Sequence, residues 1–389
     1  MKKEVELHYP LAKNCLKQDD IEVLKRFLDR GMFTMGEHVR DFEYGFSKNH
    51  NVMANSGSSA NLLMIASFVS TGRLKAGDKV IVPAVSWSTT YFPLVQYGLI
   101  PVFVDVDHTY QIDVGEVYTA VERHNAKAVF LVNLLGLMTN DFISHVRQVL
   151  EDDIMIFLDN CEGYGANLEY SKCDAVTHSF FFSHQLNTME GGMVSFLKYM
   201  RENEYHHALS LRAHGWVREQ GEGSRLYAPS GDKFKDSFTF VTVGYCLRPL
   251  EISGLLGMIE LEKWPETKKI RDQNHQYYCD IFSNKKYLEF DILPYHKDLS
   301  CFGFPFVFTS GRMRSTVVKA LLEAGIDSRP IIGGNFLNQP VMRKINHVAD
   351  GYGYEMAEAI DKRGLMIGNY AEDLRKKLDQ VDYILESVT

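Results

Sequence analysis

The chain has 389 residues and a net charge of −8, and 45% of its residues are hydrophobic and 24% charged. This length predicts two unequal domains, because a single hydrophobic core stops growing at about 250–300 residues. The acidic balance argues against a nucleic-acid partner, which would need a basic surface. No apolar stretch is long enough to span a membrane, and the first residues lack the apolar segment of a signal peptide.

The six cysteines are scattered along the chain, and no two of them form a C-x-x-C pair. This spacing indicates neither a zinc site nor an iron–sulfur site, so we expect no metal. A reduced protein of the cytoplasm is the simplest interpretation.

The first predicted element is a helix over residues 19–31. Asp19 is its expected N-cap, with Glu22 three residues on, and Gly31 can end it.

Between residue 55 and about residue 200, short apolar runs alternate with helix-length segments such as Ser59–Ser70 and Val114–His124. The runs are Lys79–Pro83, Pro101–Val106, Ala128–Asn133, Ile154–Asp159 and Val176–Phe182. Runs that are apolar throughout predict strands covered on both faces, and hence an α/β domain with a largely parallel sheet. In such sheets, ligands bind beyond the carboxyl ends of the strands.

The remainder of the chain predicts a polar surface loop over residues 220–237 and then a long helix over Leu250–Lys269. One strand and two helices follow, at Cys301–Phe308, Arg314–Ala324 and Ala357–Arg363. We therefore expect a large domain over residues 1–250 and a smaller α+β domain over residues 251–389.

Three segments carry residues suited to chemistry. The turn Asn55–Asn61, with the sequence NSGSSAN, enters a helix and offers free backbone N–H groups to a phosphate, although a plain capped helix explains it equally well. Asp159 ends an apolar run, where a carboxylate can pair with a protonated ring nitrogen, bind metal or ribose, or simply cap a helix. His184 lies between Ser179 and an EGG turn and can act as an acid or a base, but a lone histidine is usually structural.

The order and spacing of these segments resemble the fold-type-I pyridoxal-phosphate enzymes, specifically the sugar aminotransferase and dehydratase family, over nearly the whole chain. The motifs that carry the resemblance are VPAVSWSTT, FVDVDHTYQID, FLDNCEGYGA, SFFFSH…EGG, LRAHGW and GYCLRPLE. The resemblance implies an aspartate-aminotransferase-like large domain with a mostly parallel seven-stranded sheet, followed by a smaller α+β domain. It also implies a homodimer with shared active sites.

In that family, the motif SF-x-x-x-K ahead of EGG supplies the lysine that binds the cofactor covalently. Counting six residues back from Glu190 gives His184, and Lys172 and Lys198 lie too far away to replace it. The resemblance therefore implies pyridoxal or pyridoxamine 5′-phosphate held without a covalent bond, with His184 as the catalytic residue. It points to the branch that removes the C3 hydroxyl of a nucleotide-linked 4-keto-6-deoxysugar, foremost a GDP-linked one, with L-glutamate as amino donor, in dideoxysugar and O-antigen synthesis.

The resemblance also assigns roles to further residues. Those implied to bind the cofactor are Gly57, Ser58, Trp87, Asp159, Glu162, Ser179 and Cys246. Those implied to bind glutamate or the nucleotide-sugar are Gly31, Met32, Phe33, Thr34, His214, Arg218, Arg248 and Arg329. Taken alone, a single tryptophan such as Trp87 is more often a core residue.

Two positions depart from the family pattern: Cys246 replaces an asparagine, and Tyr370 stands where the dehydratase branch has a histidine. The sugar and the nucleotide therefore stay open. Three rival interpretations remain. A sugar aminotransferase needs a lysine at position 184, and an iron–sulfur-assisted dehydratase needs cysteines within residues 217–245, which contain none. An inactive homologue with a binding or regulatory role is disfavoured by the retained site residues.

Overall fold

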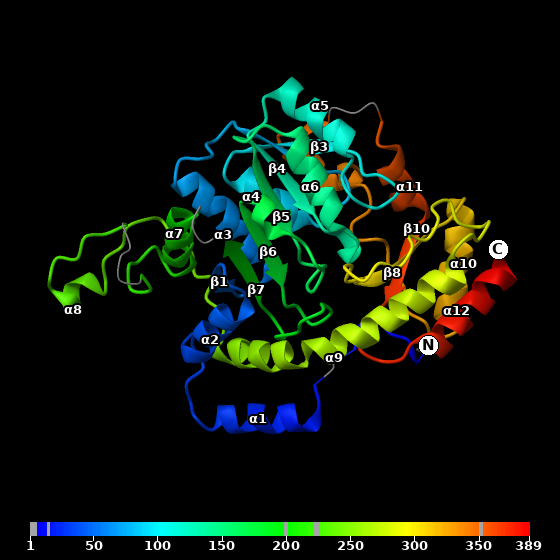
Figure 1. Cartoon of the computed structure of the whole chain (residues 1–389), viewed down its shortest axis with the longest axis horizontal. Helices are drawn as coiled ribbons and strands as arrows, with labels where there is room; N and C mark the ends of the chain where they lie inside the picture. Colours follow the sequence, from blue (N-terminus) through cyan, green and yellow to red (C-terminus); the bar gives the residue numbers. More distant parts are fainter. Residues whose placement is uncertain (1–5, 14–15, 198–200, 221–225, 350–352) are drawn as a thin grey trace.

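The computed structural model describes residues 6–13, 16–197, 201–220, 226–349 and 353–389. Its centre is an eight-stranded sheet with the strand order β1-β7-β6-β5-β4-β2-β3-β9 (Figure 1). The strands are β1 (His50–Ala54), β2 (Lys79–Pro83), β3 (Ile100–Val104), β4 (Ala128–Val132), β5 (Met155–Asp159), β6 (Ala175–Ser179), β7 (Gly192–Phe196) and β9 (Val348–Ala349).

Most neighbouring strands of this sheet are parallel, and only β7 pairs antiparallel, with β1 and with β6. The expected mostly parallel sheet of seven strands is thus confirmed for β1 to β7. The eighth strand, β9, comes from the C-terminal half and pairs through only two residues with β3. Two residues are too few for a periodic pattern, so this strand was not predicted from the sequence.

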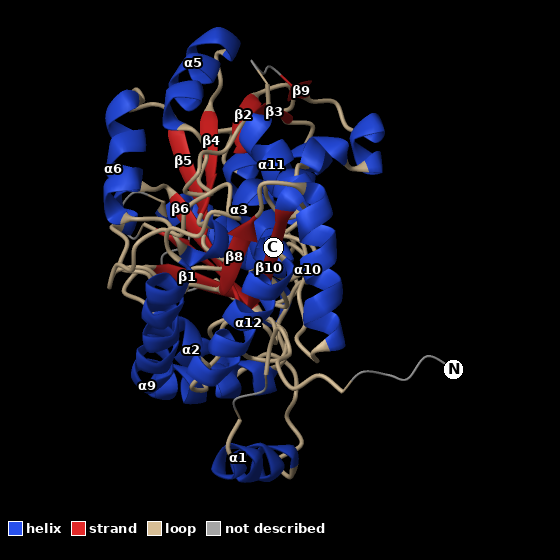
Figure 2. Ribbon diagram, turned by 90° about the vertical axis from the view of Figure 1, so that its right-hand side faces the viewer, coloured by secondary structure: helices blue, strands red, loops and turns tan. Residues whose placement is uncertain are grey.

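Helices cover both faces of the sheet, and Figure 2 shows two of them, α5 and α6, together on one side. On that face, Leu131 and Ile156 pack against α5 and α6, whereas Phe130 and Phe157 point to the opposite face. Strands enclosed in this way are apolar at every position, as the sequence indicated. The helices of the two faces are α3 (Gly57–Ser70), α4 (Ser88–Gln96) and α7 (Glu202–Arg212) on one side, and α5 (Val114–His124) and α6 (Asn140–Val149) on the other.

The long helix α9 (Glu251–Phe282) runs beneath the sheet toward the C-terminal part of the chain (Figure 1). It continues past the predicted end at Lys269, because its polar second half is buried: Arg271, for example, donates hydrogen bonds to the carbonyls of Cys301 and Phe302. The division of domains at residue 250 stays a prediction. The C-terminal elements are β8 (Gly303–Val307), α10 (Gly311–Glu323), α11 (Glu355–Arg363), β10 (Gly364–Gly368) and α12 (Arg375–Val388).

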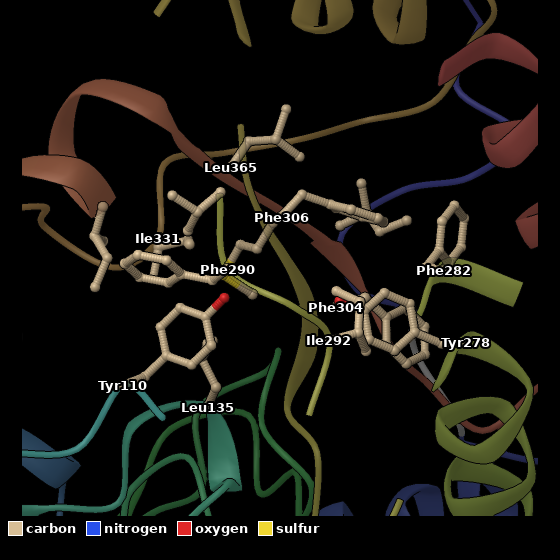
Figure 3. Close-up of a cluster of buried hydrophobic side chains, with 14 of the residues drawn as sticks. Tyr110, Leu135, Tyr278, Phe282, Phe290, Ile292, Phe304, Phe306, Ile331 and Leu365 are labelled. Carbon is tan, nitrogen blue, oxygen red and sulfur yellow. The ribbon is translucent and has the colours of Figure 1, made fainter. Parts of the chain in front are cut away.

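A buried apolar cluster joins the C-terminal part to the sheet domain (Figure 3). Tyr110 and Leu135 enter it from the sheet domain and meet Phe290 and Ile331 of the C-terminal part. Leu135 has a positive φ of 59°, which is unusual for a leucine. It lies in the short 3-10 helix η1. The helices of this kind within the described residues are η1 (Leu134–Gly136), η2 (Tyr170–Lys172), η3 (Phe336–Asn338) and η4 (Pro340–Lys344).

The N-terminal helix differs from its prediction. Helix α1 (Gln18–Leu28) begins after Lys17 and not at Asp19, which is exposed. Asp20 is buried instead, because its carboxylate accepts the N–H of Lys17 at 2.6 Å and pairs with Lys263 of α9. The sequence offered two adjacent aspartates, and only this tertiary ion pair selects between them.

The predicted loop over residues 220–237 forms an arm that projects from the body and contains α8 (Lys233–Asp236) (Figure 1). Residues 221–225 of this prediction lie outside the described part. None of the described helices is long and apolar enough to cross a membrane.

Helix α2 (Glu37–Phe46) begins on the carboxylate of Glu251, which accepts the N–H groups of Gly36, His38 and Val39 at 2.5, 2.7 and 3.4 Å. We predict that Glu251→Ala lowers the free energy of unfolding by about 1–3 kcal/mol, since buried donors lose a charged acceptor. Urea unfolding measures this change. The exposed Glu262 of the same helix is the matched control, and an equal effect of Glu262→Ala would contradict this account.

Candidate active site

The N-terminus of α3 lies directly against the carboxyl ends of two strands. Asp159 ends β5, and Ser179 ends β6. A Cβ atom added to Gly57, the first residue of α3, would lie 2.6 Å from the Cβ of Ser179 and 3.1 Å from the Sγ of Cys161. Only glycine therefore allows this close approach, which brings three of the predicted cofactor residues together.

The turn before α3 is built to present backbone N–H groups. Ser56 caps the helix by accepting the N–H of Ser59 at 3.1 Å, while Ser58 is exposed. A Cβ atom on Gly192 would lie 2.3 Å from the carbonyl oxygen of Ser56, so a second glycine lets β7 pack against the turn. The first N–H groups of a helix have no acceptor within it, and the helix dipole adds positive charge, so this turn suits a phosphate.

Asp159 is 6% exposed and accepts three hydrogen bonds. Its Oδ2 accepts from Asn61 Nδ2 at 2.8 Å and from Thr90 Oγ1 at 3.2 Å, and its Oδ1 accepts from the N–H of Cys161 at 3.1 Å. The residues that follow form turns rather than a helix, so the helix-cap alternative is wrong. Sequence reasoning assigned no role to Asn61 or Thr90, although an asparagine directly before the apolar run LLMIASFV of α3 was a usable signal.

His184 is half-buried, and its Nδ1 lies 2.7 Å from the carbonyl oxygen of Cys161. A carbonyl can only accept, so Nδ1 carries the proton and Nε2 keeps its lone pair. The ring also meets Phe302 edge-on, with centroids 5.2 Å apart. Burial lowers the pKa of His184 to about 4, against the opposing effects of the Cys161 carbonyl and Asp159. The imidazole is therefore neutral near pH 7 and can take up a proton.

Glu162 is held by the loop that contains Leu135. Its Oε2 accepts the N–H of Leu135 at 2.9 Å, and burial raises its pKa to about 7, although this bond and the charge of Arg329 lower it. Gln185, next to His184, donates its amide to the carbonyls of Glu162 and Ser300. These bonds fix the histidine loop to the loop that follows β5.

Trp87 and Arg329 lie next to each other. The Trp87 side chain is 55% exposed, so the core-packing alternative for this tryptophan is wrong. The Arg329 guanidinium carbon is 6.0 Å from the centroid of its ring. Arg329 pairs through its backbone with Met366 of β10, with its N–H 3.0 Å from the Met366 carbonyl. The C-terminal part thus places a cation beside an open aromatic face.

A second group gathers around Trp216. The centroid of the His214 ring lies 5.3 Å from the centroid of the Trp216 ring. The guanidinium carbons of Arg218 and Arg248 lie 5.2 and 5.7 Å from the Trp216 centroid. Cys246 is exposed, and its sulfur is 3.8 Å from a guanidinium nitrogen of Arg248.

One backbone bond attaches this second group to the phosphate turn. The N–H of Asn55 donates to the carbonyl of Leu247 at 3.0 Å, and Leu247 lies between Cys246 and Arg248 in the chain. Cys246 and Arg248 therefore lie close in the chain to the residue that bonds the turn before α3.

The segment Gly31–Thr34 lies at the start of α9. Thr34 forms an antiparallel bridge with Leu250, and the N–H of Glu251 donates to the carbonyl of Phe33 at 3.0 Å. Met32 is 67% exposed, so this segment is open to solvent and its substrate role stays a prediction.

Tyr370, the second departure from the family pattern, is buried and lies beside the histidine. Its hydroxyl oxygen is 2.9 Å from Lys377 Nζ. Together with His184, Glu260 and Arg271 it lines a cavity of about 20 Å³.

The chain belongs to the DegT/DnrJ/EryC1/StrS aminotransferase family, whose profile matches residues 14–389. Within this family it is 40% identical to the GDP-4-keto-6-deoxy-D-mannose 3-dehydratase of Yersinia pseudotuberculosis, over 99% of this chain and all of that protein.

Two solved structures resemble the fold closely. The Escherichia coli GDP-4-keto-6-deoxy-D-mannose-3-dehydratase with bound hydrated PLP superposes with a TM-score of 0.90, at 40% identity, over 98% of this chain and all of that one. A GDP-4-keto-6-deoxymannose-3-dehydratase with a trapped PLP–glutamate geminal diamine gives a TM-score of 0.88, also at 40% identity, with the same coverage.

We predict that Gly57→Ala weakens the binding of pyridoxal phosphate by about tenfold or more, because the new methyl group displaces the turn from Ser179 and misaligns donors to a charged group. Equilibrium dialysis measures the affinity. Ser58→Ala, which keeps the backbone in place, should cause a smaller loss. Wild-type affinity in Gly57→Ala would contradict the phosphate site.

We predict that the His184 ring titrates with a midpoint near pH 4 in the cofactor-free protein. NMR of the histidine ring protons measures the midpoint, and the signal absent from His184→Asn assigns it. A midpoint at the ordinary value of about 6.5 would show that burial does not hold the ring neutral.

Proposed function

We propose that this chain is a 3-dehydratase that uses pyridoxal or pyridoxamine 5′-phosphate to remove the C3 hydroxyl of a GDP-linked 4-keto-6-deoxysugar, with L-glutamate as amino donor. The single observation that carries the proposal is His184: it occupies the lysine position of the family, and its Nε2 is free to move a proton. The chain is 40% identical over nearly its full length to a GDP-4-keto-6-deoxy-D-mannose 3-dehydratase, and this identity supports the substrate class.

The residues present fit the cofactor. The missing side chain of Gly57 brings the N-terminus of α3 against Ser179, and the free N–H groups of this terminus together with the Ser179 hydroxyl suit the cofactor phosphate. The exposed face of Trp87 suits stacking on its ring, and the Asp159 carboxylate, which retains acceptor capacity on Oδ1, suits its ring nitrogen. When bound, the protonated ring withdraws electrons from the reacting carbon beside it.

His184 moves the proton. With Nδ1–H held by the Cys161 carbonyl, Nε2 takes up a proton from the reacting carbon, and the resulting imidazolium returns it to the C3 oxygen, which leaves as water. The lowered pKa of His184 keeps the ring neutral beforehand, and it makes the imidazolium a stronger acid for the second step. A lysine in this position would instead bind the cofactor covalently and so compete with the amino donor and the sugar.

The groups around the reacting atoms orient the ligands. In this proposal Glu162 lies near the ring hydroxyl, and His214 and Arg248 bind the carboxylates of glutamate, for which a guanidinium offers a planar fork. Arg218, Arg329 and the segment Gly31–Thr34 contact the nucleotide-sugar. Cys246 is a weaker donor than the asparagine it replaces, so it contributes less to holding the phosphate.

The proposal includes a homodimer in which a second copy of the chain covers the projecting arm. The arm and the segment that follows it expose large apolar side chains, with Phe234 86% and Val243 92% exposed. Such exposure is typical of an interaction surface. Because the arm joins His214 to Arg248 in the chain, the partner would lie against the residues that bind glutamate.

A cytoplasmic location is also part of the proposal. All five cysteines in the described part of the chain are free thiols, as is typical of a reducing compartment.

The expected product is a 3-deoxy ketosugar. We predict that a panel of GDP- and CDP-linked 4-ketosugars, incubated with protein, cofactor and glutamate, yields loss of water at C3 with release of 2-oxoglutarate and ammonia for the GDP-linked hexose. Mass spectrometry of the products measures this. A stable 4-amino sugar as the main product would establish an aminotransferase, and no 2-oxoglutarate at all would favour an inactive homologue.

We predict that His184→Asn lowers dehydration by about 10²–10⁴-fold, the usual contribution of a general acid–base, while cofactor affinity stays within a few-fold of wild type. Steady-state rates and equilibrium dialysis measure the two quantities. His296→Asn, an exposed histidine far along the chain, is the control. Full turnover in His184→Asn would remove this residue from the mechanism.

A further inference from the structure

Asn61 lies inside the site but has no role in the proposal above. It is 1% exposed, on the face of α3 that meets the sheet, and its Nδ2 donates to Asp159 Oδ2 at 2.8 Å and to the carbonyl of Thr89 at 3.2 Å. We infer that Asn61 is a positioning residue: it fixes the orientation of the Asp159 carboxylate opposite the cofactor's ring nitrogen. The inference rests on the proposed function, in which Asp159 meets that nitrogen.

A second buried hydroxyl determines how the Asn61 amide is oriented. Thr177 is 0% exposed, is the cross-strand neighbour of Asp159 on β6, and donates from Oγ1 to Asn61 Oδ1 at 2.6 Å. The amide oxygen thus faces a donor, and both N–H groups of Asn61 face acceptors. A flipped amide would turn its oxygen toward two acceptors and lose the bonds to Asp159 and to the Thr89 carbonyl, so these acceptors and the Thr177 donor favour the same orientation.

The donors around Asp159 leave one direction open. Thr90 Oγ1 is the second donor to Oδ2, at 3.2 Å, and is itself 2.8 Å from Ser86 Oγ. Oδ2 therefore accepts from two of these donors, and Oδ1 accepts the N–H of Cys161, at 3.1 Å. A carboxylate oxygen can accept two hydrogen bonds, so Oδ1 keeps one position for a further donor.

The placement of this carboxylate affects the protonation of the ring nitrogen, because a negative charge held opposite that nitrogen favours its protonated form. Removing the Asn61 N–H lets the carboxylate turn away. The protonation equilibrium of the ring nitrogen should then shift toward the unprotonated form by about tenfold or more, as expected for the loss of one hydrogen bond to a charged group. A purely structural role for Asn61, which links α3 to the sheet, would leave the equilibrium unchanged.

The test uses nitrogen-15 NMR of pyridoxal phosphate labelled at the ring nitrogen and bound to the whole protein, because the chemical shift of that nitrogen reports its protonation. The variants are Asn61→Leu, Thr177→Val, which removes the hydroxyl that orients the amide, and Thr177→Ser, which keeps it. Ser67→Ala is the matched control, since Ser67 is another fully buried polar residue of α3 and bonds only the carbonyl of Leu63 in its own helix.

We expect Asn61→Leu to shift the ring nitrogen strongly toward its unprotonated signal and Thr177→Val to shift it in the same direction by less, while Thr177→Ser and Ser67→Ala match wild type. If Asn61→Leu does not fold, Thr177→Val against Thr177→Ser decides. A wild-type signal in every folded variant would overturn the inference alone. A wild-type protein that does not bind pyridoxal phosphate would overturn the proposed function, and this inference with it.

Discussion

The backbone of Cys161 holds the two chemically decisive side chains of the site at once. Its N–H donates to Asp159, and its carbonyl accepts from Nδ1 of His184. One residue therefore sets both the direction of the carboxylate and the tautomer of the imidazole. Because Cys161 lies in the turn just two residues after the end of β5, the position of the pair depends on the central strand of the sheet.

Burial acts on two titratable groups of this site in opposite directions. It lowers the pKa of His184 to about 4 and raises that of Glu162 to about 7, because burial disfavours the charged form of either group. Arg329 lies close enough to oppose the shift of Glu162, and the Asp159 charge opposes the shift of His184. The site thus contains a neutral base next to a carboxyl group that titrates in the physiological range.

Leu135, which has a positive φ, contacts both the site and the packing between the two parts of the chain. Glu162 holds the Leu135 N–H, while the Leu135 side chain lies in the apolar cluster with Phe290 and Ile331 (Figure 3). Strained backbone persists only where its surroundings fix it, and here the surroundings are the site on one side and the C-terminal core on the other.

Local sequence patterns predicted those helices and strands whose bounds depend on residues nearby in the chain. Helix α5 and strand β2 have the predicted bounds, because Asp113 caps the helix and the strand is enclosed on both faces. The second half of α9 was missed because its buried polar residues, such as Arg271, are satisfied by carbonyls far away in the sequence. The same limit applied to Asn61, whose partners Asp159 and Thr177 lie about a hundred residues away.

The resemblance assigned Trp87, Asp159, Ser179 and His184 to the site, because motif order carries information that periodicity lacks. The structure places Asp159 and Ser179 at the ends of β5 and β6, and it places His184 against the Cys161 carbonyl, while the roles of these residues stay predictions. The tautomer of His184 and the network behind Asp159 required three-dimensional contacts, since no spacing rule connects Cys161 to His184.

The central claim is that a histidine at position 184 leaves the cofactor without a covalent bond to the protein. Intact-mass spectrometry after incubation with pyridoxal phosphate and reduction with borohydride tests it most directly, with His184→Lys as the matched comparison. The account predicts that the wild-type mass stays unchanged, whereas His184→Lys gains one cofactor. One cofactor attached to a lysine of the wild-type protein, such as Lys172, would contradict it.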